Sequence, residues 1–154
     1  MKKIILSLSL FAVIYSSAQK TTEKPKFNQK LATELGADKY GMKPYVIVML
    51  TTGATKIEDK VKMGELMKGH MGNIQKLVDE GKIVVAGPFT GDNKQNFEGM
   101  FIFNTKSKEE AESWVKTDPA VKAGVFGYEI FPWYGSAALP LYLKYHDEIS
   151  QESH

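Results

Sequence analysis

The 154-residue chain contains no cysteine and no arginine. The absence of cysteine excludes disulfides, thiolate nucleophiles and zinc or iron–sulfur centres held by sulfur. The absence of arginine removes the rigid fork of donors that proteins use to bind phosphate or carboxylate at two points, so lysine must act as a point charge. Redox proteins that use thiols or disulfides and anion sites built on arginine are therefore excluded.

Histidine and net charge are also scarce. The chain has three histidines, scattered and without H-x-x-x-H spacing, so a zinc site has little support. The formal charge is +2, and without Lys2 and Lys3 the lysines equal the acidic residues in number. That balance offers no basic surface for nucleic acid. The sequence also lacks a P-loop, a G-x-S-x-G motif and a dinucleotide fingerprint, so we expect no nucleic-acid partner and no cofactor.

A long apolar run occurs at the very start. Lys2 and Lys3 precede an apolar stretch from Ile4 to Tyr15, and the small residues Ser-Ser-Ala follow at 16–18. This order predicts a secretory signal peptide of residues 1–18. The run is too short to span a membrane comfortably. We therefore expect a periplasmic or secreted protein with no membrane attachment after cleavage.

Residues 19–43 form a polar lead-in, and a domain of residues 44–135 follows. In the lead-in, Phe27, Leu31 and Leu35 recur at every fourth position before Gly36, which predicts a short helix. The domain shows strand patterns at 45–50, 82–89, 97–105 and 125–133, and helical patterns at 58–80 and 107–115. The order β-α-β-β-α-β predicts an α+β fold, a ferredoxin-like sandwich. The tail, 136–154, is ambiguous, and we expect its polar end to be loose.

Several strands are apolar at adjacent as well as alternate positions. Examples are "MFIF" at 100–103 and "EIFPW" at 129–133. Because adjacent strand residues point to opposite faces, both faces of the sheet must be covered. Helices cover one face, and a second copy of the sheet would cover the other. We therefore expect a homodimer with its sheets face to face.

The stretch "GHMGN", residues 69–73, places a histidine inside an amphipathic helix. At about 100° per residue, His70 falls within the apolar arc, while Gly69 and Gly72 project toward the polar side. Each glycine costs about 1 kcal/mol relative to alanine, and close approach by the lead-in would be one reason for them. His70 is either a packed histidine without a role or a functional group.

Asp118 precedes Pro119, a pair that suits the start of a helix. Aspartate is a favoured N-cap, and proline is favoured at the first helical position. Capping alone explains Asp118 from the residues.

Two stretches resemble the YCII-like family: "GHMGNIQKLVDEGKIVVAGPF" and "SKEEAESWVKTDPAVKAGVFGYEIFPW". They resemble its H-x-x-x-L-x-x-G, G-P and D-P steps over about residues 45–134. The resemblance implies a dimeric α+β barrel of ferredoxin-like subunits, with His70 and Asp118 as an active-site dyad between helices and sheet. The chain departs from the family in its signal peptide and long lead-in. It also has Ala120 where an aromatic residue is common, and it lacks an arginine before the histidine, where Lys68 is the nearest cation.

Such a dyad would suit proton transfer or elimination on a small cyclic or aromatic molecule. Met67, Met71 and Phe89 are the apolar walls we expect, and this chemistry needs no cofactor. One alternative is a secreted dimer that binds a small apolar ligand without chemistry, which the Met- and aromatic-rich interior also permits. Another is an oxygenase of the same barrel type acting on haem or a quinol, although the fold does not determine the function.

Overall fold

Four antiparallel strands form one sheet in the order β2-β3-β1-β4. The computed structural model describes residues 26–151. The strands are β1 (Met42–Thr52), β2 (Ile83–Pro88), β3 (Phe97–Phe103) and β4 (Phe126–Ser136). Successive βα units are thus interleaved, because β3 lies between β1 and β2 and β1 lies between β3 and β4.

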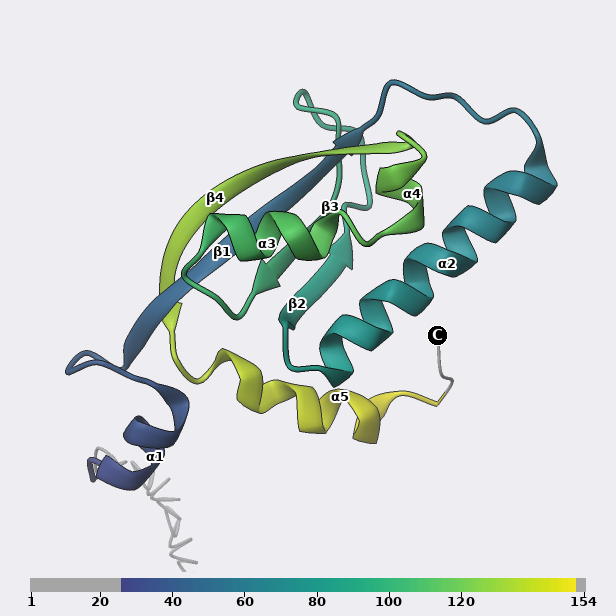
Figure 1. The fold of residues 1–154 in the computed structure, drawn as a ribbon. Helices are drawn as coiled ribbons and strands as arrows, with labels where there is room; N and C mark the ends of the chain where they lie inside the picture. Colours follow the sequence, from purple (N-terminus) through teal and green to yellow (C-terminus); the bar gives the residue numbers. More distant parts are fainter. Residues whose placement is uncertain (1–25, 152–154) are drawn as a thin grey trace, which may run out of the picture.

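Three helices pack beside this sheet: α2 (Lys60–Asp79), α3 (Lys108–Val115) and α4 (Pro119–Lys122) (Figure 1). Helix α2 follows β1, and α3 and α4 lie between β3 and β4 along the chain. The predicted α+β class is confirmed, and the element order is consistent with a ferredoxin-like fold.

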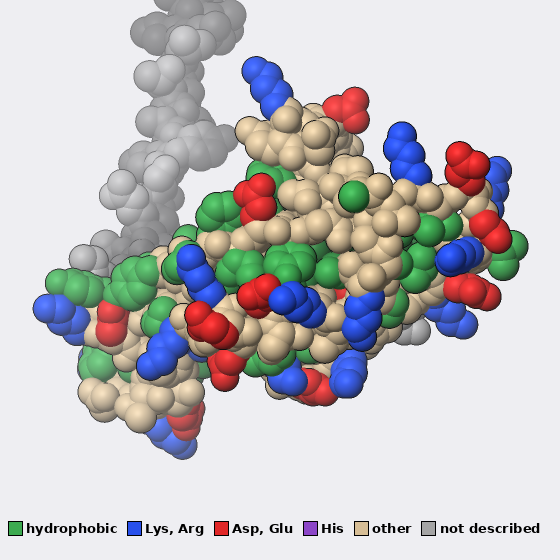
Figure 2. All heavy atoms as spheres, turned by 45° about the horizontal axis from the view of Figure 1, so that its top comes forward, with side chains coloured by type: hydrophobic (Ala, Val, Ile, Leu, Met, Phe, Trp, Pro, Cys, Tyr) green, Lys and Arg blue, Asp and Glu red, His purple; other side chains and the backbone are tan. Residues whose placement is uncertain are grey.

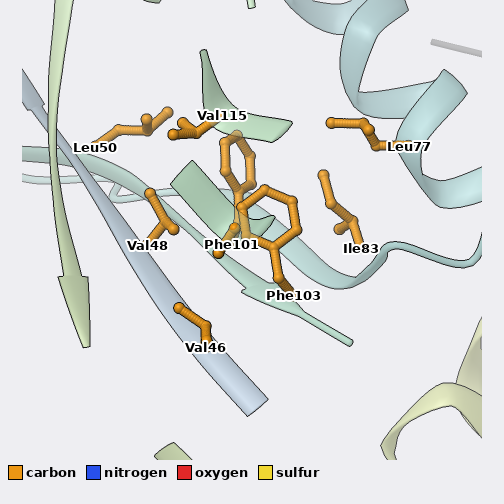
Figure 3. Packing of buried hydrophobic residues seen from close by; sticks show 9 residues of the cluster. Val46, Val48, Leu50, Leu77, Ile83, Phe101, Phe103 and Val115 are labelled. Carbon is orange, nitrogen blue, oxygen red and sulfur yellow. The ribbon is translucent and has the colours of Figure 1, made fainter. Parts of the chain in front are cut away.

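The main core lies between the sheet and these helices. Phe101 and Phe103 project from β3 into a cluster with the valines of β1 and with residues of α2, α3 and β2 (Figure 3). The fully buried members are Val46, Val48, Leu50, Leu77, Ile83, Phe101, Phe103, Ala111 and Val115. Alternate residues of β1 enter this cluster, as the period of two along a strand requires.

The lead-in is tied to the sheet. Helix α1 (Gln29–Leu35) ends at Gly36, whose φ of +69° is the left-handed cap predicted there. Asp38 then accepts hydrogen bonds from the backbone N–H groups of Tyr40 and Met42 and from the Tyr134 hydroxyl. The Tyr134 bond is the main cause of a lowered pKa for the Asp38 carboxyl. These bonds explain why β1 starts at Met42, earlier than the expected residue 45.

The first part of the tail, ambiguous in the sequence, is helical in the structure, and its polar end is exposed. A 3₁₀ turn, η1 (Leu139–Tyr142), and a helix, α5 (Leu143–Ile149), follow β4. Leu139 packs against Tyr45, Val84 and Ile102 on the sheet face opposite the main core. The tail therefore covers part of the face for which a second copy was expected.

The rest of that opposite face is half-buried or exposed. Phe131 and Trp133 of β4 are 43% and 37% exposed. Phe131 pairs with Ile47, and the Trp133 ring lies 5.8 Å from that of Tyr45. We call the surface formed by Phe131, Trp133 and Ile47 the outer-face patch.

Lysine and acidic side chains are interspersed over the surface seen in Figure 2, without a large field of one sign. Among residues 26–151 no helix is long and apolar enough to cross a membrane. The predicted signal peptide, residues 1–18, and His154 lie outside the described residues.

Candidate active site

His70 and Asp118, 48 residues apart in the sequence, meet between α2 and the start of α4. His70 Nδ1 lies 2.5 Å from Asp118 Oδ2. The two side chains are 12% and 1% exposed. Asp118 is the buried charged residue among those the structure describes. A buried carboxylate requires a partner, and the imidazole supplies one.

Asp118 also caps α4. Its Oδ1 accepts hydrogen bonds from the backbone N–H groups of Ala120, at 2.8 Å, and Val121, at 3.4 Å. The two carboxylate oxygens are thus used differently, with Oδ1 on the helix and Oδ2 on the histidine. Capping explains the aspartate in sequence, but capping occupies only one of its oxygens.

The carboxylate determines which ring nitrogen of His70 carries hydrogen. Because Asp118 Oδ2 accepts at Nδ1, we assign the neutral imidazole its proton on Nδ1. Nε2 then keeps its lone pair and faces away from the aspartate. A histidine held in this way can accept a proton at Nε2 and return it, as a general base and acid does.

Two phenylalanine rings flank His70. The Phe126 ring lies 5.2 Å from the imidazole, edge to face, and the Phe101 ring lies 6.3 Å away, tilted. The expected walls were different. Of the walls expected from the sequence, Met67 is half-buried, and Met71 and Phe89 are 41% and 43% exposed. The helical wheel placed His70 on the apolar side of α2 but could not show which strands it meets.

Gly69 is explained by Pro119, not by the lead-in. A Cβ at Gly69 would lie 3.0 Å from Pro119 Cγ and 3.3 Å from Pro119 Cβ. Helix α2 therefore touches the D-P step beside the dyad, and the predicted polar orientation of Gly69 is wrong. A Cβ at Gly72 would meet nothing within 4 Å.

Gly69→Ala and Gly72→Ala form a matched pair of substitutions in one helix. Gly72→Ala is expected to raise the free energy of unfolding by about 0.5–1 kcal/mol, because alanine is the better helix former. Gly69→Ala is expected to lose that gain, since its methyl group pushes against Pro119. Urea denaturation measures both. Equal stabilisation by the two substitutions would show that α2 and Pro119 are not in close contact.

A hollow of about 380 Å³ lies at the β2–β3 hairpin, and the dyad does not line it. Its walls are Thr52, Phe89, Thr90, Gly91, Asp92, Asn93, Asn96, Phe97 and Glu98, and neither His70 nor Asp118 is among them. Thr52 pairs with Phe126 across β1 and β4, so the hollow opens at the same end of the sheet as the dyad. Among the described residues, no group of three or more histidine, aspartate or glutamate side chains could hold a metal ion.

Phe126 and Phe101 are the site residues that the sequence reading missed. Phe101 was identified only as a core or interface residue, and Phe126 only as part of a strand. Their proximity to His70 depends on how α2 crosses the sheet. The apolar periodicity of the sequence carries no information about this crossing. His146, in α5, is exposed and remote from this pair in the chain.

Part of the chain is similar to known proteins. No curated protein matches the chain. A solved structure, the 5-chloro-2-hydroxyhydroquinone dehydrochlorinase of Burkholderia phenoliruptrix in complex with 2,5-dihydroxybenzoquinone, is 23% identical and has a TM-score of 0.42. The match covers 59% of this chain and 93% of that one. The model of the YCII-related domain matches residues 45–134, more than half of the sequence. The chain therefore belongs to the family of proteins with a YCII-related domain.

Proposed function

We propose that the protein is a cofactor-free enzyme in which His70 and Asp118 transfer a proton to and from a small cyclic or aromatic molecule. The observation that carries the proposal is the 2.5 Å contact between His70 Nδ1 and Asp118 Oδ2. It joins a buried carboxylate to an imidazole that retains some access to solvent. The chain itself supplies the base, and proton abstraction or elimination needs no further group.

The class of substrate follows from the surroundings of the imidazole. Phe101 and Phe126 present aromatic surface beside His70, and planar rings pack favourably against such surface. The lack of arginine argues against a phosphorylated or multiply charged substrate. A small ring with an acidic C–H or O–H, or with a leaving group next to such a position, fits best.

His70→Gln is expected to lower turnover at least about a hundredfold, the typical effect of losing a general acid–base group. Glutamine keeps a polar side chain of similar size but cannot take up a proton. The assay screens hydroxylated benzenes and cyclic ketones by mass spectrometry, for deuterium uptake from D₂O or loss of a leaving group. His146→Gln is the matched control, because it changes an exposed histidine of α5.

The alternative is a protein that binds a small apolar ligand without reaction. It predicts no turnover in the screen and equal binding of a ring compound such as hydroquinone by wild type and His70→Gln. Turnover that survives in His70→Gln would reject the dyad as the catalytic group.

We also propose that two copies associate through the outer-face patch. Exposed aromatic side chains on a sheet face are costly in water and typical of an interface. Phe131 and Trp133 contribute such surface here. A second copy of the same sheet is its simplest partner, since an isologous contact buries the same patch on both subunits.

Export from the cytoplasm is proposed from the first 18 residues. Their charged start, apolar run and small residues fit a cleaved signal. N-terminal sequencing of the mature protein is expected to begin at Gln19. A chain that retains Met1 after expression in a secreting host would contradict this proposal.

A further inference from the structure

Three residues of α2 contact three consecutive residues, which are the two of the D-P step and Thr117 before it. Gly69 lies against Pro119, and His70 bonds Asp118. One turn further along α2, Asn73 Oδ1 lies 2.9 Å from Thr117 Oγ1. The order along α2 is thus the reverse of the order from Thr117 to Pro119.

The Thr117 hydroxyl also lies 2.7 Å from the backbone oxygen of Trp114. A hydroxyl has one proton, and a backbone carbonyl can only accept, so Thr117 donates to Trp114. Its oxygen must then accept from Asn73, which requires the amide of Asn73 to present its NH₂ group; the two amide orientations are assigned from such networks. The chain of bonds runs from Asn73 through Thr117 to the end of α3.

We propose that Asn73 and Thr117 are positioning residues for the His70–Asp118 pair. His70 and Asn73 are three residues apart and therefore neighbours on one face of α2. Thr117 is adjacent to Asp118. A bond between Asn73 and Thr117 sets where the D-P step sits along the helix, and this determines how Asp118 Oδ2 meets His70 Nδ1.

The apolar contacts between α2 and α4 do not set this position. Pro119 touches Gly69 through carbon atoms, which limits how closely α4 approaches but does not select a position along α2. Helix α4, Pro119–Lys122, has one turn and packs against α2, but van der Waals contact is not directional. A directional bond supplies what the apolar contact lacks.

The test is the tautomer of His70, read from the ¹⁵N spectrum of the imidazoles in the full mature chain. The His70 signals are assigned by their loss in His70→Gln. Thr117→Ala and Asn73→Ala are each expected to lower the ratio of the Nδ1–H to the Nε2–H form by about two- to tenfold, the effect of one ordinary hydrogen bond. Thr117→Ser, which keeps the hydroxyl, is expected to restore the ratio.

Ser113→Ala is the matched control. The Ser113 hydroxyl donates to the backbone oxygen of Glu110 at 2.7 Å, three residues back, as Thr117 does to Trp114. Ser113→Ala therefore removes the same kind of local bond, but Ser113 has no link to α2. We expect this substitution to leave the His70 spectrum unchanged. Asn73→Ala protects the test against a folding defect, because alanine favours the helix.

The proposal is overturned if Thr117→Ala changes the His70 spectrum no more than Ser113→Ala does, or if Thr117→Ser fails to restore it. The role of Asn73 and Thr117 in catalysis rests on the proposed function, but the measurement of the His70 tautomer does not. A spectrum that responds as expected in a protein without turnover would retain the positioning pair and reject the enzyme. Turnover that depends on His70, with a His70 spectrum that Thr117→Ala does not change, would retain the enzyme and reject the positioning pair.

Discussion

Asp118→Ala is expected to lower the free energy of unfolding by about 2–4 kcal/mol. Loss of an N-cap typically costs about 0.5–2 kcal/mol, and here the cap serves Ala120 and Val121. The change also leaves His70 Nδ1 without its partner in a largely buried position, which costs about 1–3 kcal/mol. Urea denaturation followed by circular dichroism measures the sum.

Asp118→Asn separates the two roles of this side chain. The amide oxygen can still cap α4, so we expect stability to stay within about 1 kcal/mol of wild type. The amide NH₂ takes the place of Oδ2 and donates to His70 Nδ1, which moves the imidazole proton to Nε2. The proposed base is then occupied by a proton, and turnover should fall at least about a hundredfold.

The ¹⁵N spectrum of His70 checks the tautomer in Asp118→Asn, and the turnover assay checks its consequence. A variant as unstable as Asp118→Ala would show that the contact of the carboxylate with His70, not the cap, dominates the stability. A stable variant with unchanged His70 signals would show that the contact between the two side chains is absent in solution.

Phe131→Glu is expected to raise the dissociation constant of the proposed dimer at least about a hundredfold. Phe131 lies in the outer-face patch and is 43% exposed in the single chain. A carboxylate there would be buried without a partner against the second copy, at a cost of several kcal/mol, and each 1.4 kcal/mol is a factor of ten in affinity. Light scattering after size-exclusion chromatography, over a dilution series, measures the change.

Val61→Glu is the control for the charge itself. Val61 is 73% exposed on α2, away from the outer-face patch in the fold, so the same new carboxylate should leave the mass unchanged. A wild-type protein that is monomeric at tens of micromolar, or a Phe131→Glu protein that stays dimeric, would reject this face as the interface.

The sequence alone was sufficient for the α+β class and for the order of the elements. Strand and helix periods differ, and each records which side of its own element is buried. Gly36 was identified as a helix end for a similar reason, and it adopts positive φ.

The arrangement around His70 was decided by the tertiary structure. From the residues alone Asp118 was explained by capping, and only resemblance to a family paired it with His70. Met67, Met71 and Phe89 were expected as walls because they are apolar, whereas the rings beside His70 are those of Phe101 and Phe126. Gly69 was assigned to the polar side until Pro119 was found against it. A period tells which side of a helix is covered, whereas the identity of the covering residue depends on how distant segments pack.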